Sequence, residues 1–103
     1  MQDRNEQLAE RLRAAERARD LLTDLERRLK DEDDPELEHT LRRLDQLAWS
    51  LPEADRIRWF VESAAGAARA RDARRAGTDV SRSRSAVEGE VFTLQGTLKR
   101  RAT

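Results

Sequence analysis

Residues 37–51 read LEHTLRRLDQLAWSL, and their apolar positions have the heptad spacing of a helix that packs against other helices. The apolar seam, in steps of 4, 3, 4 and 3, is Leu37, Leu41, Leu44, Ala48 and Leu51. Pro35 precedes it, and proline is well tolerated in the first turn of a helix because an amide hydrogen there would have no intrahelical partner. The stretch therefore predicts an amphipathic helix over about residues 36–50.

The segment before this helix has the same periodicity over a greater length. Apolar residues recur every three or four positions from Arg4 to Lys30, which predicts a long helix over about residues 4–31. They are Leu8, Leu12, Ala15, Ala18, Leu22, Leu25 and Leu29. The acidic run at residues 31–34 should end this helix, because negative charges oppose the dipole at a helix C-terminus.

A third helix is expected after Pro52. The order Ser50-Leu51-Pro52-Glu53 has the spacing of a capping box, and the following pattern predicts a helix over about residues 53–76. Its expected buried face is Ile57, Phe60, Val61, Ala64, Ala67 and Ala68. Gly77 suits the end of this helix. A single kinked helix that continues through Pro52 is the alternative.

The C-terminal part of the sequence allows two structures. A polar stretch, residues 78–85, predicts a loop, and residues 86–101 form either a helix or a β-hairpin. The heptad positions that favour helix are Val80, Val87, Val91, Leu94 and Leu98. The residues that resist helix are Gly89, Thr93, Gly96 and Thr97, with a hairpin turn at Gln95-Gly96 as the rival. Because an isolated hairpin is only marginally stable, the helix is favoured.

Composition bounds the fold class. The chain has 103 residues, of which 41% are charged and only 4% aromatic, so its core must be thin and filled mainly by leucine. We therefore predict an all-α fold with coiled-coil character, either an antiparallel helical hairpin or a small three- to four-helix bundle, in one domain over residues 1–103. The long leucine seams also predict self-association, most simply as a homodimer.

Several classes of chemistry are not expected from this sequence. Cysteine is absent and histidine occurs once, so we predict no disulfide, no metal site and no cofactor. We find no glycine-rich phosphate loop and no nucleophile with a base and an orienting residue, and therefore predict that the protein is not an enzyme. No apolar run could act as a signal peptide or span a membrane, which predicts a cytoplasmic protein.

The one histidine, His39, lies in the stretch Glu38-His39-Thr40-Leu41-Arg42. Over four residues this stretch is similar to the His-Thr-Leu-Lys segment of histidine phosphotransfer domains, which are helical bundles of about this length. Those domains follow the lysine with a small residue, where this chain has Arg43. We therefore expect an ordinary histidine that faces solvent, about 200° around the helix from Leu37.

A second stripe on the predicted third helix is the candidate protein-binding site. It consists of Trp59, Ser63, Gly66, Ala70, Ala73 and Gly77, in steps of 4, 3, 4, 3 and 4. Small residues at this spacing let another backbone approach closely, and a large aromatic beside them is a typical interface anchor. These residues predict a small non-enzymatic interaction protein, such as an adaptor, an assembly or scaffolding factor, or an inhibitor of a larger partner. The stripe could instead pack against the chain's own first or fourth helix.

The alternative function is accessory nucleic-acid binding through a basic cluster. The cluster is Arg69, Arg71, Arg74, Arg75, Arg82 and Arg84, helped by Lys99, Arg100 and Arg101. Arginine is well suited to phosphate, although no helix-turn-helix or other reading motif is evident. Residues 1–34 carry 11 acids against 8 bases, so the cluster could equally pair with acidic residues of the chain itself. The small size, the charge and the lack of motifs also suit a phage or mobile-element protein.

Overall fold

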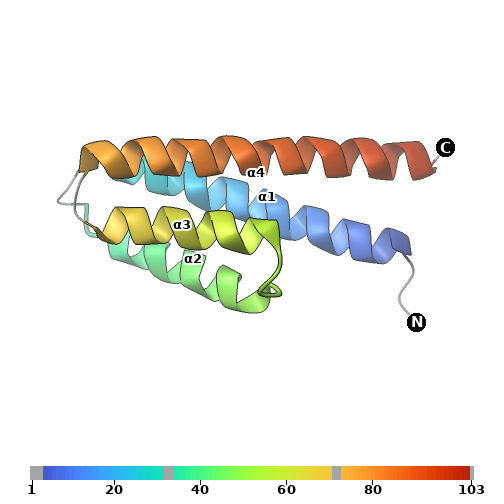
Figure 1. Ribbon diagram of the computed structural model, residues 1–103, viewed down its shortest axis with the longest axis horizontal. Coiled ribbons are helices and arrows are strands. Elements are labelled where there is room, and N and C mark those ends of the chain that lie inside the picture. Colours follow the sequence, from blue (N-terminus) through green and yellow to red (C-terminus); the bar gives the residue numbers. More distant parts are fainter. Residues whose placement is uncertain (1–3, 32–33, 71–72, 103) are drawn as a thin grey trace.

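In the computed structural model the described residues are 4–31, 34–70 and 73–102, and they form a bundle of helices. The helices are α1 (Arg4–Arg28), α2 (Leu37–Ser50), α3 (Arg56–Arg69) and α4 (Ala73–Ala102). The described residues contain no strand, so the expected all-α bundle is confirmed. Figure 1 shows that α2 and α3 lie along one half of the long α1–α4 pair, and that α1 and α4 continue together beyond them.

The core draws side chains from all four helices. Its largest fully buried members are Leu22, Leu25, Leu44, Ile57, Val61, Val80 and Val87. Both apolar seams expected in the first half of the chain lie in this core or pack against it. Burial of each such side chain contributes about 1.5–3 kcal/mol, which makes this shared core the main source of stability.

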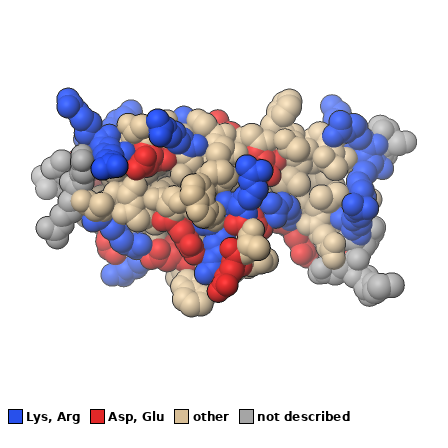
Figure 2. All heavy atoms as spheres, viewed as in Figure 1, with Lys and Arg blue, Asp and Glu red and all other residues tan. Residues whose placement is uncertain are grey.

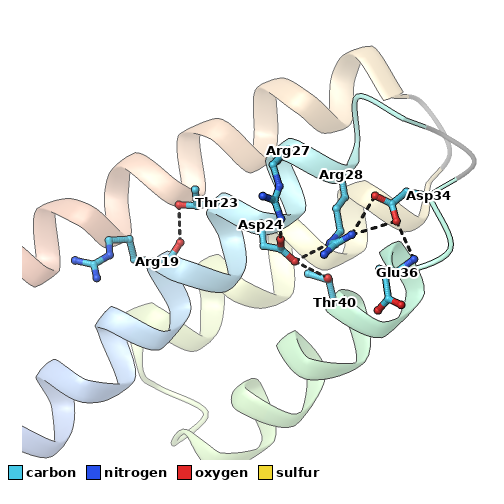
Figure 3. A network of polar contacts seen from close by, with 8 residues as sticks. All are labelled: Arg19, Thr23, Asp24, Arg27, Arg28, Asp34, Glu36 and Thr40. Carbon is cyan, nitrogen blue, oxygen red and sulfur yellow. Dashed lines mark hydrogen bonds and ion pairs between the residues drawn. The ribbon is translucent and has the colours of Figure 1, made fainter.

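A polar network joins the last turn of α1 to Asp34 and to the first turns of α2 (Figure 3). The carboxylate of Asp24 accepts hydrogen bonds from Arg27 (2.6 Å), Arg28 (2.8 Å) and the hydroxyl of Thr40 on α2 (2.8 Å). Arg28 also donates to both carboxylate oxygens of Asp34, at 3.1 Å each. Helix α1 therefore ends at Arg28, earlier than the expected residue 31, and its last turn is tied to the start of α2.

The turn between α2 and α3 differs from the expected capping box. Ser50 donates its hydroxyl hydrogen back to the carbonyl of Leu47 and caps nothing. Asp55 is the N-cap instead, and its side chain accepts the amide hydrogen of Ile57 at 2.9 Å. Arg11 of α1 donates to the other oxygen of Asp55 at 2.7 Å. The alternative of one kinked helix through Pro52 is therefore wrong, and the turn is anchored to α1.

The C-terminal half corrects two expectations and confirms a third. Helix α3 ends at Arg69, where a helix to residue 76 was expected, and a new helix begins at Ala73. The loop expected at residues 78–85 is wrong, because α4 runs through it without a break to Ala102. The same finding decides the question left open at residues 86–101 in favour of helix.

Packing explains why α4 is continuous despite its composition. Val80 and Val87 are fully buried, and Ser83 between them is 5% exposed, so one heptad seam runs through the serine-rich segment. Arg84 donates to Glu26 on α1 and to Glu88 one turn further along α4. Contacts with α1 and α3 therefore outweigh the weak helix propensity of serine, threonine and glycine here.

Candidate protein-binding groove

Three of the four aromatic side chains lie on the surface. Trp49, Trp59 and Phe92 are 80%, 62% and 79% exposed, whereas Phe60 is partly buried against the core. Large aromatic side chains contribute most when buried in a core or an interface. Because leucine, valine, isoleucine and alanine fill this core, the exposed aromatics are left available for contacts with another molecule.

Trp59 stands beside a hollow between α3 and α4. The hollow has a volume of about 450 Å³ and is lined by Trp59, Phe60, Ser63, Asp79, Arg82 and Ser83. The rings of Trp59 and Phe60 meet edge to face, with centroids 5.2 Å apart. A second hollow of about 240 Å³ follows along the same two helices, lined by Ala67, Ala70, Arg75, Ala76 and Asp79. Asp79 borders both hollows, and we call the two together the α3–α4 groove.

The expected stripe is only partly a single helical face. Trp59, Ser63 and Gly66 lie on α3 and Ala70 caps it, but Ala73 and Gly77 belong to α4, so the stripe does not continue on one helix. The side chain of Ala73 lies outside the described part of the chain.

Three of the remaining stripe residues are open to solvent. Trp59, Gly66 and Ala70 are exposed, and a Cβ atom added at Gly66 would meet nothing within 4 Å. These three residues therefore do not pack against the chain's own first or fourth helix, whereas Ser63 is half-buried in the hollow beside α4. Its binding role stays a prediction.

The structure divides the expected arginine cluster. Arg69 donates to both oxygens of Asp45 on α2, at 3.0 and 2.6 Å, and these hydrogen bonds raise the pKa of Arg69. The hydrogen bonds of Arg84 with Glu26 and then Glu88 raise its pKa in the same way. Two of the expected phosphate contacts are therefore used within the fold.

The other basic residues lie toward the two ends of α4. Arg74, Arg75 and Arg82 are exposed near its start, and Lys99, Arg100 and Arg101 are exposed at its end. Figure 2 shows blue atoms over both ends of the upper edge, where α4 lies, with mainly uncharged atoms between them. Arg71 lies outside the described residues. The cluster is thus two basic regions rather than one patch.

Sequence reasoning missed two exposed aromatics. Phe92 lines a hollow of about 540 Å³ on α4 with Thr93, Gly96, Lys99 and Arg100. Phe92 directly follows the buried Val91, so it lies on another side of the helix and does not face the core. This spacing was the signal in the sequence that could have identified Phe92 as exposed. Trp49 lies near the end of α2, where the guanidinium of Arg58 is 5.8 Å from its ring centroid. This contact depends on tertiary structure and has no signal in the sequence.

The structure also bears on the remaining expectations. His39 is exposed on α2, as expected. Among the described residues, no group of three or more His, Asp or Glu side chains could hold a metal ion, and no helix is long and apolar enough to cross a membrane. No protein-family model, curated protein or solved structure matches this chain.

Proposed function

We propose that this protein is a small non-enzymatic interaction protein that binds another protein through the α3–α4 groove. An adaptor, an assembly or scaffolding factor, and an inhibitor that covers a site on a larger partner all fit this description. The observation that carries the proposal is Trp59, a side chain 62% exposed beside a hollow in a protein that makes little use of aromatics in its core.

The groove has the features of a helix-binding surface. Trp59 supplies a large apolar contact, and the exposed Gly66, which lies on α3 beside the groove and lines neither hollow, permits a close approach of another backbone. Asp79 and Arg82 border the hollow and can orient a partner through hydrogen bonds. A partner helix laid along the groove would cover Trp59 and the alanines of the second hollow together.

Affinity capture from a lysate of the native host, with and without nuclease, tests the proposal. We expect a stoichiometric protein that survives nuclease and is lost with Trp59→Ala, because truncation of an interface anchor costs about 2 kcal/mol or more. The matched control is Trp49→Ala, which removes an exposed tryptophan that lines neither hollow of the groove. Equal capture by the wild-type protein and Trp59→Ala would contradict the proposal.

Accessory nucleic-acid binding is the second candidate. The observation in its favour is the exposure of Arg74, Arg75 and Arg82 near the start of α4. Three phosphate contacts would give a log-log salt slope of about −3 for duplex DNA. Absence of duplex binding at low salt would exclude this candidate, and retained binding after replacement of all three arginines by glutamine would exclude this site.

Self-association and a cytoplasmic location belong to the same proposal. The leucine seams that predicted a dimer are buried inside the bundle of one chain, so they no longer argue for a second copy. The argument for self-association now depends on the groove. The absence of cysteine supports a reducing compartment.

A further inference from the structure

We propose that the occupant of the α3–α4 groove is a second copy of this chain, related by a twofold axis that sets the two α3 helices antiparallel. The inference rests on the proposed function, because it names the partner of the same groove. A twofold contact requires a surface that is its own complement. The groove meets this requirement in shape and in charge.

The exposed face of α3 carries a large side chain at one end and small residues at the other. Trp59 lies near the start of the helix, and Gly66 and Ala70 lie about 10 and 16 Å further along its axis, at 1.5 Å per residue. Antiparallel pairing places the indole of each copy over the small end of the partner. Gly66 is exposed with nothing within 4 Å of an added Cβ atom, so the partner's Trp59 can approach the backbone there without a clash.

The charges of the groove are also reciprocal. Asp79 and Arg82 border the same hollow as Trp59 and are about 4.5 Å apart along α4. Neither side chain has an ion-pair partner within residues 4–31, 34–70 and 73–102. A twofold axis that passes between them sets Arg82 of each copy against Asp79 of the other. Two equivalent ion pairs then form at the edge of the contact.

The other exposed aromatic surface does not have this property. Phe92 shares its hollow with Lys99 and Arg100, and among the residues that the structure describes no acidic side chain lines that hollow. Twofold pairing there would bring basic side chains together, which disfavours contact. The charges therefore favour the α3–α4 groove over the Phe92 surface as the contact between copies.

Sedimentation equilibrium over about 1 µM to 1 mM tests the inference. The face is about 21 Å long and two helices wide, so we expect a small interface and a dissociation constant in the micromolar range. Trp59→Ala removes one indole from each copy and should weaken the dimer by about 30-fold or more for each indole lost, whereas Trp49→Ala should leave it unchanged. Circular dichroism of each variant checks that the helices are retained. A wild-type protein that stays monomeric at 1 mM would overturn the inference.

Charge reversal tests the reciprocal ion pairs. Asp79→Arg gives a groove with two bases, and Arg82→Asp gives a groove with two acids, so each variant alone should dimerise more weakly than the wild-type protein. An equimolar mixture should form the heterodimer preferentially in native mass spectrometry, because both ion pairs then have opposite charges. A statistical mixture of dimers would overturn the proposed geometry.

The two proposals fail in different ways. If the protein is monomeric at 1 mM yet captures a lysate protein through Trp59, the groove remains a binding site for another protein. Only the proposal that a second copy occupies it is then rejected. If Trp59→Ala affects neither self-association nor lysate capture, both proposals are rejected.

Discussion

Asp24 is the residue at which α1 and α2 are held together by polar contacts (Figure 3). Burial of its carboxylate would by itself favour the neutral form, but hydrogen bonds from Arg28, Thr40 and Arg27 outweigh this effect and lower the pKa of Asp24. A carboxylate whose pKa is lower in the folded state stabilises the fold above its unfolded pKa of about 3.9. That contribution is lost as the pH falls through the lowered folded pKa.

We expect Asp24→Asn to lower the free energy of unfolding by about 1–2 kcal/mol at pH 7, since hydrogen bonds to a charged group are lost. The deficit should shrink as the pH falls below the unfolded pKa of about 3.9 and through the lowered pKa of the folded protein, because the wild-type carboxylate then becomes protonated. Urea denaturation at pH 7 and pH 2.5 measures both values. The matched control is Asp20→Asn on the same helix, whose side chain is 71% exposed. A deficit that stays constant with pH would contradict the assigned role.

Asp55 performs the capping task that the sequence had indicated for Ser50, and it also ties the turn to α1. It caps α3 and accepts a hydrogen bond from Arg11, and its side chain is only 7% exposed. Asp55→Ala should cost about 1–3 kcal/mol, the sum of a lost cap and an unpaired Arg11. Chemical denaturation measures this cost, with Glu53→Ala in the exposed turn as the control. A loss of less than 0.5 kcal/mol would show that the turn is held by other contacts.

At the scale of the element, the sequence predicted α1 and α2 closely and α4 poorly. Long leucine seams with few competing signals define the first two helices, and helix periodicity is then decisive. In α4 the valine seam was recognised, but Gly77 and the serines of residues 78–85 carry turn signals of comparable strength. The helix forms because α1 and α3 bury the valine seam, and the free energy of that burial is not part of local propensity.

Continuity of α4 can be tested at its glycines. A Cβ atom added at Gly89 would meet nothing within 4 Å, and the residue lies inside the helix. Gly89→Ala should therefore raise the free energy of unfolding by about 0.5–1 kcal/mol and the Tm by about 3–6 °C. Gly77→Ala should behave alike, because it also lies inside α4 with open space around it. A lower Tm for either variant would indicate a turn at that glycine.

At the scale of the whole molecule, the predictability of the site follows from the fold. Trp59, Ser63 and Gly66 were found because they share a face of one helix, which periodicity reveals. Asp79 and Arg82 were not connected with them, because only the packing of α4 beside α3 brings the two sets together. The expected arginine cluster is not a single surface patch, for a related reason. Arg69 and Arg84 form ion pairs with acidic residues on other helices.

The α1–α4 pair has two regions, one packed against α2 and α3 and one that extends beyond them. Ion pairs of Arg11 with Asp55 and of Glu90 with Arg56 mark the place where α2 and α3 end along it. Beyond that place α1 and α4 continue as a pair, with neither α2 nor α3 alongside them (Figure 1). This two-helix arm buries less apolar surface than the four-helix part, and local opening should therefore cost less there.

Hydrogen exchange measured by mass spectrometry should reveal that difference. We expect residues 4–10 and 95–102 to exchange together by opening of the arm, while residues 15–25 exchange only through global unfolding. Leu98→Ala truncates a half-buried apolar side chain in the arm and should speed exchange at residues 4–10 but not at residues 15–25. Thr93→Ala, an exposed substitution on the same helix, should leave both regions unchanged. Equal protection of residues 4–10 and 15–25 in the wild-type protein would mean that the arm has further support, and a second chain in contact with it would then be the first possibility to examine.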